Sequence, residues 1–227
     1  MGIGTGSVSL GDIQTEYGGS NPIGLSEYYG KGNAPASGEI QLWADFQGTS
    51  SGTHTLLATV TASASGSLSF TSGIDSTYDV YEFRFENMHP ATFGARLAFQ
   101  MDGGSGYATA MTTTNYLVEQ AESDSETYFG YRTGRDQHDG TGYQPISGNI
   151  ATNSDDAASG ILIIFGPSST TYVKHFMSNA NVSGNGFSDN NHVAGYFNTT
   201  SALTRISFAM SSGNIDAGQI KMYGIGT

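Results

Sequence analysis

From about residue 53 onward, apolar and polar positions alternate along the chain, and turn-forming residues interrupt the pattern about every ten residues. In Val80–Glu86 three aromatic side chains alternate with three charged ones, and Leu97–Met101 places Leu, Phe and Met at every second position. Such alternation is typical of a strand with one buried face and one polar face. The pattern predicts strands over Thr53–Thr61, Ser67–Thr71, Val80–Glu86, Leu97–Met101, Tyr107–Thr113, Thr127–Arg132, Gly160–Phe165, Tyr172–Ser178, Val193–Asn198, Leu203–Met210 and Gln219–Ile225.

Gly160–Phe165 differs from the other strands because it has no polar position. A short run of this kind indicates a central strand that is covered on both faces. No run of ten or more residues has the spacing of an amphipathic helix. Many short strands separated by turns predict an all-β fold, a β-sandwich that we expect to be jelly-roll-like.

Three stretches of this region lack the alternation and are predicted to be loops. Glu119–Glu126 is rich in acidic residues and suits a loop or one helical turn. Gly134–Asp156 is the longest stretch without periodicity, and we expect it to be an excursion on the surface. Asn185–His192, rich in glycine and asparagine where it begins, is predicted to be a third loop.

The first 50 residues have a different organisation, in which a short sequence motif occurs three times. Val8–Gly19, Ile23–Gly30 and Ile40–Gly48 each contain a β-branched residue, a leucine, an acidic residue near an aromatic or Ile, and a closing glycine. Each repeat suits one helical turn, and Ser9 is placed to cap the first of them. A single turn is too short to bury its own apolar residues, so the arm must pack on its own domain, a sister chain or another protein.

The amino-acid sequence of these repeats resembles a segment of a known class of protein. Residues 7–30, SVSLGDIQTEYGGSNPIGLSEYYG, and residues 42–48, LWADFQG, are similar to a segment near the start of many tailed-bacteriophage virion proteins, including tail-fibre and tail-tip subunits. In that family the third repeat usually ends in Asp-Phe-Tyr-Gly, from which Trp43 and Gln47 depart. Residues 211–225 resemble, more weakly, the closing strand of β-sandwich modules in phage structural proteins, as do Tyr81–Asn87, His89–Ala91 and Asp102–Ser105 in the middle of the chain.

This resemblance implies a structural subunit of a phage virion appendage: a tail fibre, a tail tip or a baseplate-associated part. The linker Gly48–Gly52 would separate an attachment arm, residues 1–50, from a displayed β-sandwich, residues 51–227. Other virion proteins would be its partners, a homotrimer is the expected assembly, and a capsid decoration or head-fibre protein is a further alternative. The residues expected to make the assembly contacts are Leu10, Ile13, Tyr17, Leu25, Tyr28, Tyr29, Leu42, Trp43 and Phe46.

Composition narrows the classes of function. The net charge is −12, and the eight Lys and Arg residues are scattered singly, which argues against nucleic-acid binding and against anionic membranes. No segment approaches the roughly 18 apolar residues of a membrane-spanning helix. The absence of cysteine excludes disulfides, thiol nucleophiles and thiolate metal sites.

No cluster of polar residues gives a convincing catalytic or metal site. A metal ion could be bound by Asp136, His138 and Asp139. Three ligands so close in sequence rarely face one point, however, so a solvated loop is the simpler interpretation. The acids of Glu119–Glu126 are also expected to be solvated, so they do not form the framed pair that a glycosidase needs. We therefore expect no enzyme activity, no cofactor and no metal.

Receptor binding is the second function that the sequence supports. Aromatic faces and amide groups are the side chains that bind sugars. Two predicted loops carry such residues, and the candidate receptor-facing residues are Tyr143, Gln144, Phe187, Asn190 and His192. Such loops would suit an adhesin that binds a host-surface glycan, although polar loops with scattered aromatics are also ordinary in β-sandwiches.

Overall fold

The computed structural model describes residues 9–19, 28–35, 40, 54–104 and 106–226. The chain divides into two compact units, Met1–Thr53 and His54–Thr227. Each unit is described by itself below.

The N-terminal unit contains one helix, α1, Leu10–Tyr17. The Asp12 N–H donates to Ser9 Oγ over 3.2 Å, and Asp12 Oδ2 accepts from the Ser9 N–H over 2.8 Å. These two bonds form a reciprocal cap that satisfies donors at the helix start. Gly18 ends the helix with a φ of 74°. The Ser9 cap predicted for the first repeat is confirmed, and the helix, with eight residues, is longer than the single turn predicted.

The same unit has a small hydrophobic cluster of its own. Ile13, Tyr28 and Ala34 are buried, and Tyr17 and Ile40 pack against them. The expectation that the repeats leave their apolar residues to an outside partner is therefore wrong for Ile13 and Tyr28, because the first two repeats bury these side chains together. Of the other predicted assembly residues, Leu10 is half-buried and Tyr29 is exposed. Leu25, Leu42, Trp43 and Phe46 lie outside the described residues.

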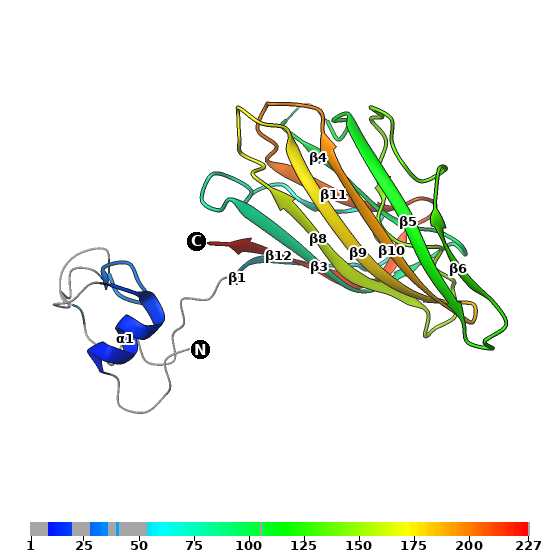
Figure 1. Cartoon of the computed structure of the whole chain (residues 1–227), viewed down its shortest axis with the longest axis horizontal. Helices are drawn as coiled ribbons and strands as arrows, with labels where there is room; N and C mark the ends of the chain where they lie inside the picture. Colours follow the sequence, from blue (N-terminus) through cyan, green and yellow to red (C-terminus); the bar gives the residue numbers. More distant parts are fainter. Residues whose placement is uncertain (1–8, 20–27, 36–39, 41–53, 105, 227) are drawn as a thin grey trace. The chain divides into compact units, whose positions relative to one another are not determined.

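The second unit is a β-sandwich of two antiparallel sheets, which confirms the predicted all-β sandwich (Figure 1). The large sheet has the strand order β1-β12-β3-β8-β9-β10-β5-β6, and the small sheet has the order β2-β11-β4-β7. The strands are β1 His54–Thr61, β2 Leu68–Phe70, β3 Val80–Pro90, β4 Leu97–Asp102, β5 Met111–Ala121, β6 Thr127–Tyr131, β7 Gln144–Pro145, β8 Ala157–Phe165, β9 Lys174–Gly184, β10 Phe187–Phe197, β11 Arg205–Met210 and β12 Ile215–Ile225.

Aromatic side chains fill the space between the two sheets. Phe83 of the large sheet lies 5.7 Å from Phe208 of the small sheet, and Phe99 lies 5.0 Å from Phe176, measured between ring centres. All of these rings are buried, as the alternating pattern of β3 and β4 requires. The buried residues described for this cluster lie between Ala62 and Met222.

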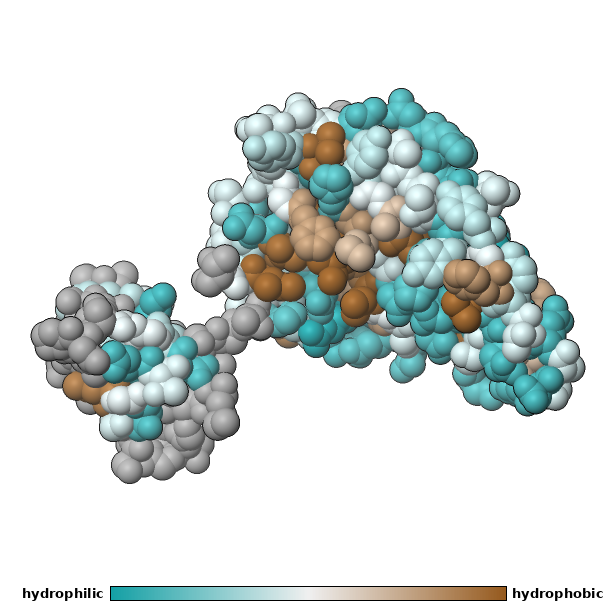
Figure 2. Space-filling model, in the orientation of Figure 1, coloured by the Kyte–Doolittle hydropathy of each residue, from teal (hydrophilic) through white to brown (hydrophobic). Residues whose placement is uncertain are grey.

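The central strand β8 is covered on one face only. Leu162 and Ile164 point into the core, while 37% of Ile161 and 38% of Phe165 is exposed on the opposite face. The prediction of a central strand is confirmed, but the prediction of cover on both faces is wrong, because no described layer of the sandwich itself packs on the outer side of the large sheet. Figure 2 shows hydrophobic residues gathered on this side of the sandwich.

The three predicted loops are more ordered than the sequence indicated. Residues 144–145 form β7, and Ile146, Ser147 and Ile150 are fully buried, so residues 134–156 are not a surface excursion alone. Residues 119–121 belong to β5, and residues 187–192 belong to β10. Asn185 and Gly186, both with positive φ, form the two-residue turn between β9 and β10.

Candidate functional site

The outer face of the large sheet carries a cluster of aromatic and amide side chains from three adjacent strands. Tyr116 of β5 and His192 of β10 are directly opposite each other and stack, with ring centres 4.7 Å apart and planes at 8°. Asn179 of β9 faces His192 from the other side, and its Nδ2 lies 2.9 Å from a ring nitrogen of His192. The same Nδ2 donates to Asn190 Oδ1 over 2.9 Å.

A shallow hollow of about 390 Å³ lies on the same strands. Its walls include Phe165, His175, Met177 and Tyr196, and small side chains such as Ala194 leave the space between them open. The exposed aromatic rings and the amide cluster together form a surface that could bind a flat or ring-shaped ligand by stacking and hydrogen bonds.

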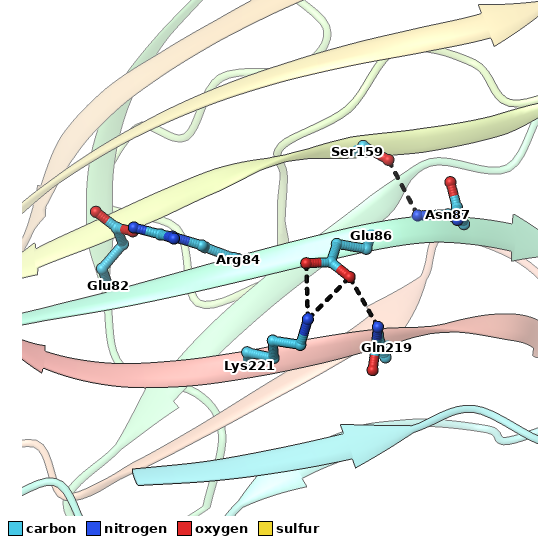
Figure 3. A network of polar contacts seen from close by, with 7 residues as sticks. All are labelled: Glu82, Arg84, Glu86, Asn87, Ser159, Gln219 and Lys221. Carbon is cyan, nitrogen blue, oxygen red and sulfur yellow. Dashed lines mark hydrogen bonds and ion pairs between the residues drawn. The ribbon is translucent and has the colours of Figure 1, made fainter. Parts of the chain in front are cut away.

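The opposite part of this face is polar, and its charges neutralise one another (Figure 3). Glu86 of β3 accepts from Lys221 Nζ over 3.0 Å and from Gln219 Nε2 over 2.7 Å. These hydrogen bonds lower the pKa of Glu86. Arg84 pairs with Glu82 on the same strand. These groups are already paired, so this part of the face offers few free polar atoms to a ligand.

A second cluster, which sequence reasoning missed, joins three of the five arginines. Arg96 precedes β4, and Arg132 and Arg135 follow β6. Arg96 Nη1 and Arg135 Nη2 each donate to Asn149 Oδ1 over 3.3 Å. Arg132 lies 4.0 Å from the carboxylate of Glu119 and sits over the ring of Tyr128, 4.2 Å from its centre.

Two carboxyl groups meet beside these arginines. Glu119 of β5 and Asp189 of β10 are directly opposite each other in the sheet, and Asp189 is only 8% exposed. Burial, and after it the neighbouring Glu119 carboxyl, raise the pKa of Asp189 to about 6. Burial, and after it the positive charges of Arg96 and Arg132, lower the pKa of Arg135 to about 10. Both Asp189 and Arg135 are thus held where their charged forms are disfavoured.

The arginine and carboxyl groups line two hollows. One, of about 330 Å³, is bounded by Arg96, Tyr131 and residues 132–135. The other, of about 190 Å³, is lined by Phe93, Phe187, Glu119, Asp189 and Asn149. Asn149 and Glu119 connect the two hollows, since each lines the smaller one and contacts an arginine of the larger one.

The five candidate receptor-facing residues do not form one site. Asn190 and His192 lie together on the outer face, whereas Phe187 points to the other side of β10 and lines the smaller hollow. Tyr143 is half-buried, apart from both groups.

The prediction for Gln144 is wrong, because this side chain is fully buried. Gln144 Oε1 accepts from Thr113 Oγ1 over 2.7 Å, and Gln144 Nε2 donates to the carbonyls of Arg135 and Pro145 over 2.8 Å each. Both polar atoms of this amide form hydrogen bonds, and these bonds connect the segment that follows β6 with strand β5. Gln144 therefore cannot face a receptor.

The acids and histidine of residues 136–139 point to different partners. Asp136 Oδ2 accepts from the Tyr131 hydroxyl over 2.8 Å and lies 3.5 Å from His138 Nε2, while Asp139 accepts from Asn198. In the described part of the chain, no three His, Asp or Glu side chains converge on a point that could hold a metal ion. Among the described residues there is also no helix with the length and apolar character to span a membrane.

One short signal in the sequence could have revealed the second cluster. Asn185-Gly186 is the residue pair that a two-residue hairpin turn prefers. A hairpin there would place residues 187–197 in a strand. Asp189 would then lie on the same face of that strand as Phe187 and Val193, and this face points inward. The proximity of the three arginines, by contrast, depends on contacts between distant segments and has no local signal.

Comparisons of the chain with models of protein families, with curated proteins and with solved structures gave no match. The fold and the two clusters therefore carry the functional argument together with the sequence resemblance of the N-terminal repeats.

Proposed function

We propose that this protein is a structural subunit of a bacteriophage virion appendage, in which the N-terminal unit attaches the chain and the β-sandwich is displayed outward. The observation that carries the proposal is the separation of the two hydrophobic clusters. Among the described residues, Ile13, Tyr28 and Ala34 form one cluster, and buried residues between Ala62 and Met222 form the other. The described core of the sandwich is built from its own strands and loops, which supports a separate role in attachment for the N-terminal unit.

Two further features support an assembly role. The amino-acid sequence of the N-terminal repeats resembles a segment of tail-appendage proteins. The outer face of the large sheet exposes apolar residues, and Met177 at its centre is 57% exposed. Exposed apolar surface of this kind is typical of faces that meet another macromolecule. Other virion proteins and further copies of this chain, with a trimer as the expected assembly, are the partners that we propose.

Electron microscopy of phage particles tests the location. Gold-labelled antibodies raised against residues 54–227 should bind at the tail or its appendages, on the particles of a phage that encodes this chain. Label on the capsid would instead support a decoration or head-fibre protein. Particles without label, from a preparation in which the chain is absent by mass spectrometry, would contradict a virion role.

Recognition of a host glycan is a second candidate function, favoured by the cluster on the outer face. The stacked Tyr116 and His192 and the bonded Asn179 and Asn190 combine a ring surface with amide groups. A glycan array probed with the full chain tests this function. Binding that is lost in Tyr116→Ala would support it, and binding unchanged by this substitution would place any sugar site elsewhere.

A further inference from the structure

The end of the sandwich near the turn between β9 and β10 is polar on the inside as well as on the outside. Asn115 of β5 and Asn191 of β10 are fully buried, and neither amide has a hydrogen-bond partner among the described residues. Asp189 is 8% exposed, and its Oδ1 also lacks a partner there. Buried polar atoms normally find a partner in the protein, in water or in a ligand. Asp189 lines the smaller hollow, so a ligand bound there would meet this carboxyl group.

The arginine side of this region is also incompletely satisfied. Arg96 Nε, Arg132 Nε and Arg135 Nη1 are buried donors without an acceptor among the described residues. Three guanidinium groups converge here in a chain whose net charge is −12. Holding like charges together is unfavourable, and the pKa of Arg135 is lowered first by burial and then by the positive charges of Arg96 and Arg132. An anionic group in the larger hollow would relieve the repulsion.

We propose that the two connected hollows form one binding site for a sugar that carries an acidic group. Arg96, Arg132 and Arg135 bind the oxyanion, because the guanidinium fork matches the oxygens of a carboxylate or sulfate. Asp189, Glu119 and Asn149 accept or donate hydrogen bonds to the sugar hydroxyls. Phe93, which is 65% exposed, and Phe187 flank the smaller hollow and can contact the apolar face of the ring.

The chemistry of the site favours a hydroxylated acid over other anions. A simple inorganic ion would use the arginines but would leave the Asp189 oxygen without a donor. A neutral sugar would meet the carboxyls and Asn149 but would leave the arginine charges together. Only a ligand with both an oxyanion and hydroxyl groups satisfies both sides. The inference goes beyond the proposed virion role and does not depend on it, because it rests on residues 93–189 alone.

A glycan array with matched carboxylated, sulfated and uncharged members, probed with the full chain, tests the ligand class. We expect binding to acidic members and at least ~10-fold weaker binding to their uncharged counterparts, since one charge-assisted contact contributes about this factor. Preference for carboxylated or for sulfated members identifies the source of the oxyanion, and either preference supports the proposal. Equal binding of uncharged members, or binding of none, would overturn it.

Matched arginine variants test the location of the site. Arg96→Gln and Arg135→Gln should each weaken binding of the best acidic glycan at least ~10-fold, because each removes a guanidinium from the larger hollow. Arg84→Gln is the control, since Arg84 lies on the outer face and pairs with Glu82. If a Gln variant does not fold, Arg96→Lys keeps the charge and should still bind more weakly. Wild-type affinity in every variant of the cluster would overturn the proposal.

Nuclear magnetic resonance gives a readout that needs no variant. On addition of the same glycan to the wild-type chain, the Nε–Hε signals of Arg96, Arg132 and Arg135 should shift. The signals of Arg84 and Arg205, the other two arginines, should remain in place. Shifts confined to Arg84 and Arg205, or no shift in the cluster at saturating glycan, would overturn the assignment of the site. The virion location could still hold in that case, because the gold-labelling experiment tests it separately.

Discussion

Asp189 is an acidic residue at a buried position, 8% exposed. The charges of Glu119, Arg135 and Arg132 act on it, and its pKa is raised to about 6, first by burial and then by Glu119. Its environment depends on which face of β10 it occupies. The alternation of apolar and polar residues in 187–193 indicates which face Asp189 occupies only if these residues are recognised as a strand. The sequence predicts a loop there instead. Ser9 and Asp12, by contrast, could be predicted because a helix cap involves residues only three positions apart.

The raised pKa of Asp189 predicts how stability depends on pH. The folded protein binds the Asp189 proton more tightly than the unfolded chain does. This contribution to stability is fully present below pH ~4 and is lost as pH rises through about 6. Asp189→Asn removes the contribution, so the stability of the variant relative to wild type should increase between pH 4 and pH 7.

Urea denaturation of both proteins at several pH values measures this difference. The charged neighbours of Asp189 are Glu119, Arg132 and Arg135, and they are the same in both proteins. A difference in the free energy of unfolding that is constant from pH 4 to pH 7 would contradict the raised pKa.

At the scale of elements, most of the sandwich could be predicted from alternation. Strands such as β3 and β4 have one face in the core, and their other face is exposed or packs against other segments. Their alternating sequences predict this arrangement directly. The errors arose where the exposure of an element is set by distant partners. Gln144 and Ile146 are buried because their segment pairs with β4 and contacts β5, and β8 is exposed on one side because no described residue of the sandwich covers the large sheet there. No local pattern reports the presence or absence of such a partner.

The contact between β8 and its neighbours gives a prediction for Gly160. A Cβ at this position would lie 2.3 Å from the Asn179 carbonyl oxygen and 2.8 Å from Phe85 Cζ, and the first of these is backbone that cannot move freely. Gly160→Ala should therefore destabilise the sandwich by about 1–3 kcal/mol, the usual cost of overpacking.

Gly134→Ala is the matched control, since a Cβ there meets nothing within 4 Å. Thermal and urea denaturation of the two variants measure the effect. The control should be no less stable than wild type, because alanine reduces the entropy of the unfolded chain. Equal stability of Gly160→Ala and wild type would mean that β8 and β9 are not packed as closely as described.

At the scale of the whole molecule, the chain combines two units with separate hydrophobic clusters. The sequence predicted the second unit as a sandwich but underestimated the first, because pairing of two repeats around Ile13 and Tyr28 is a contact between segments. The three-arginine cluster has the same origin, since Arg96 and Arg135 meet at Asn149, which lies in a third segment. Both features are consequences of tertiary structure and could not be read from a single stretch.

Removal of the N-terminal unit tests the central claim most directly. The first strand begins at His54, so a chain of residues 54–227 keeps every strand of both sheets. Light scattering combined with size-exclusion chromatography should show this chain as a folded monomer and the full chain as an oligomer, with a trimer expected. If residues 54–227 keep the full oligomer size, or if the full chain is itself a monomer, the assembly role of the N-terminal unit is contradicted.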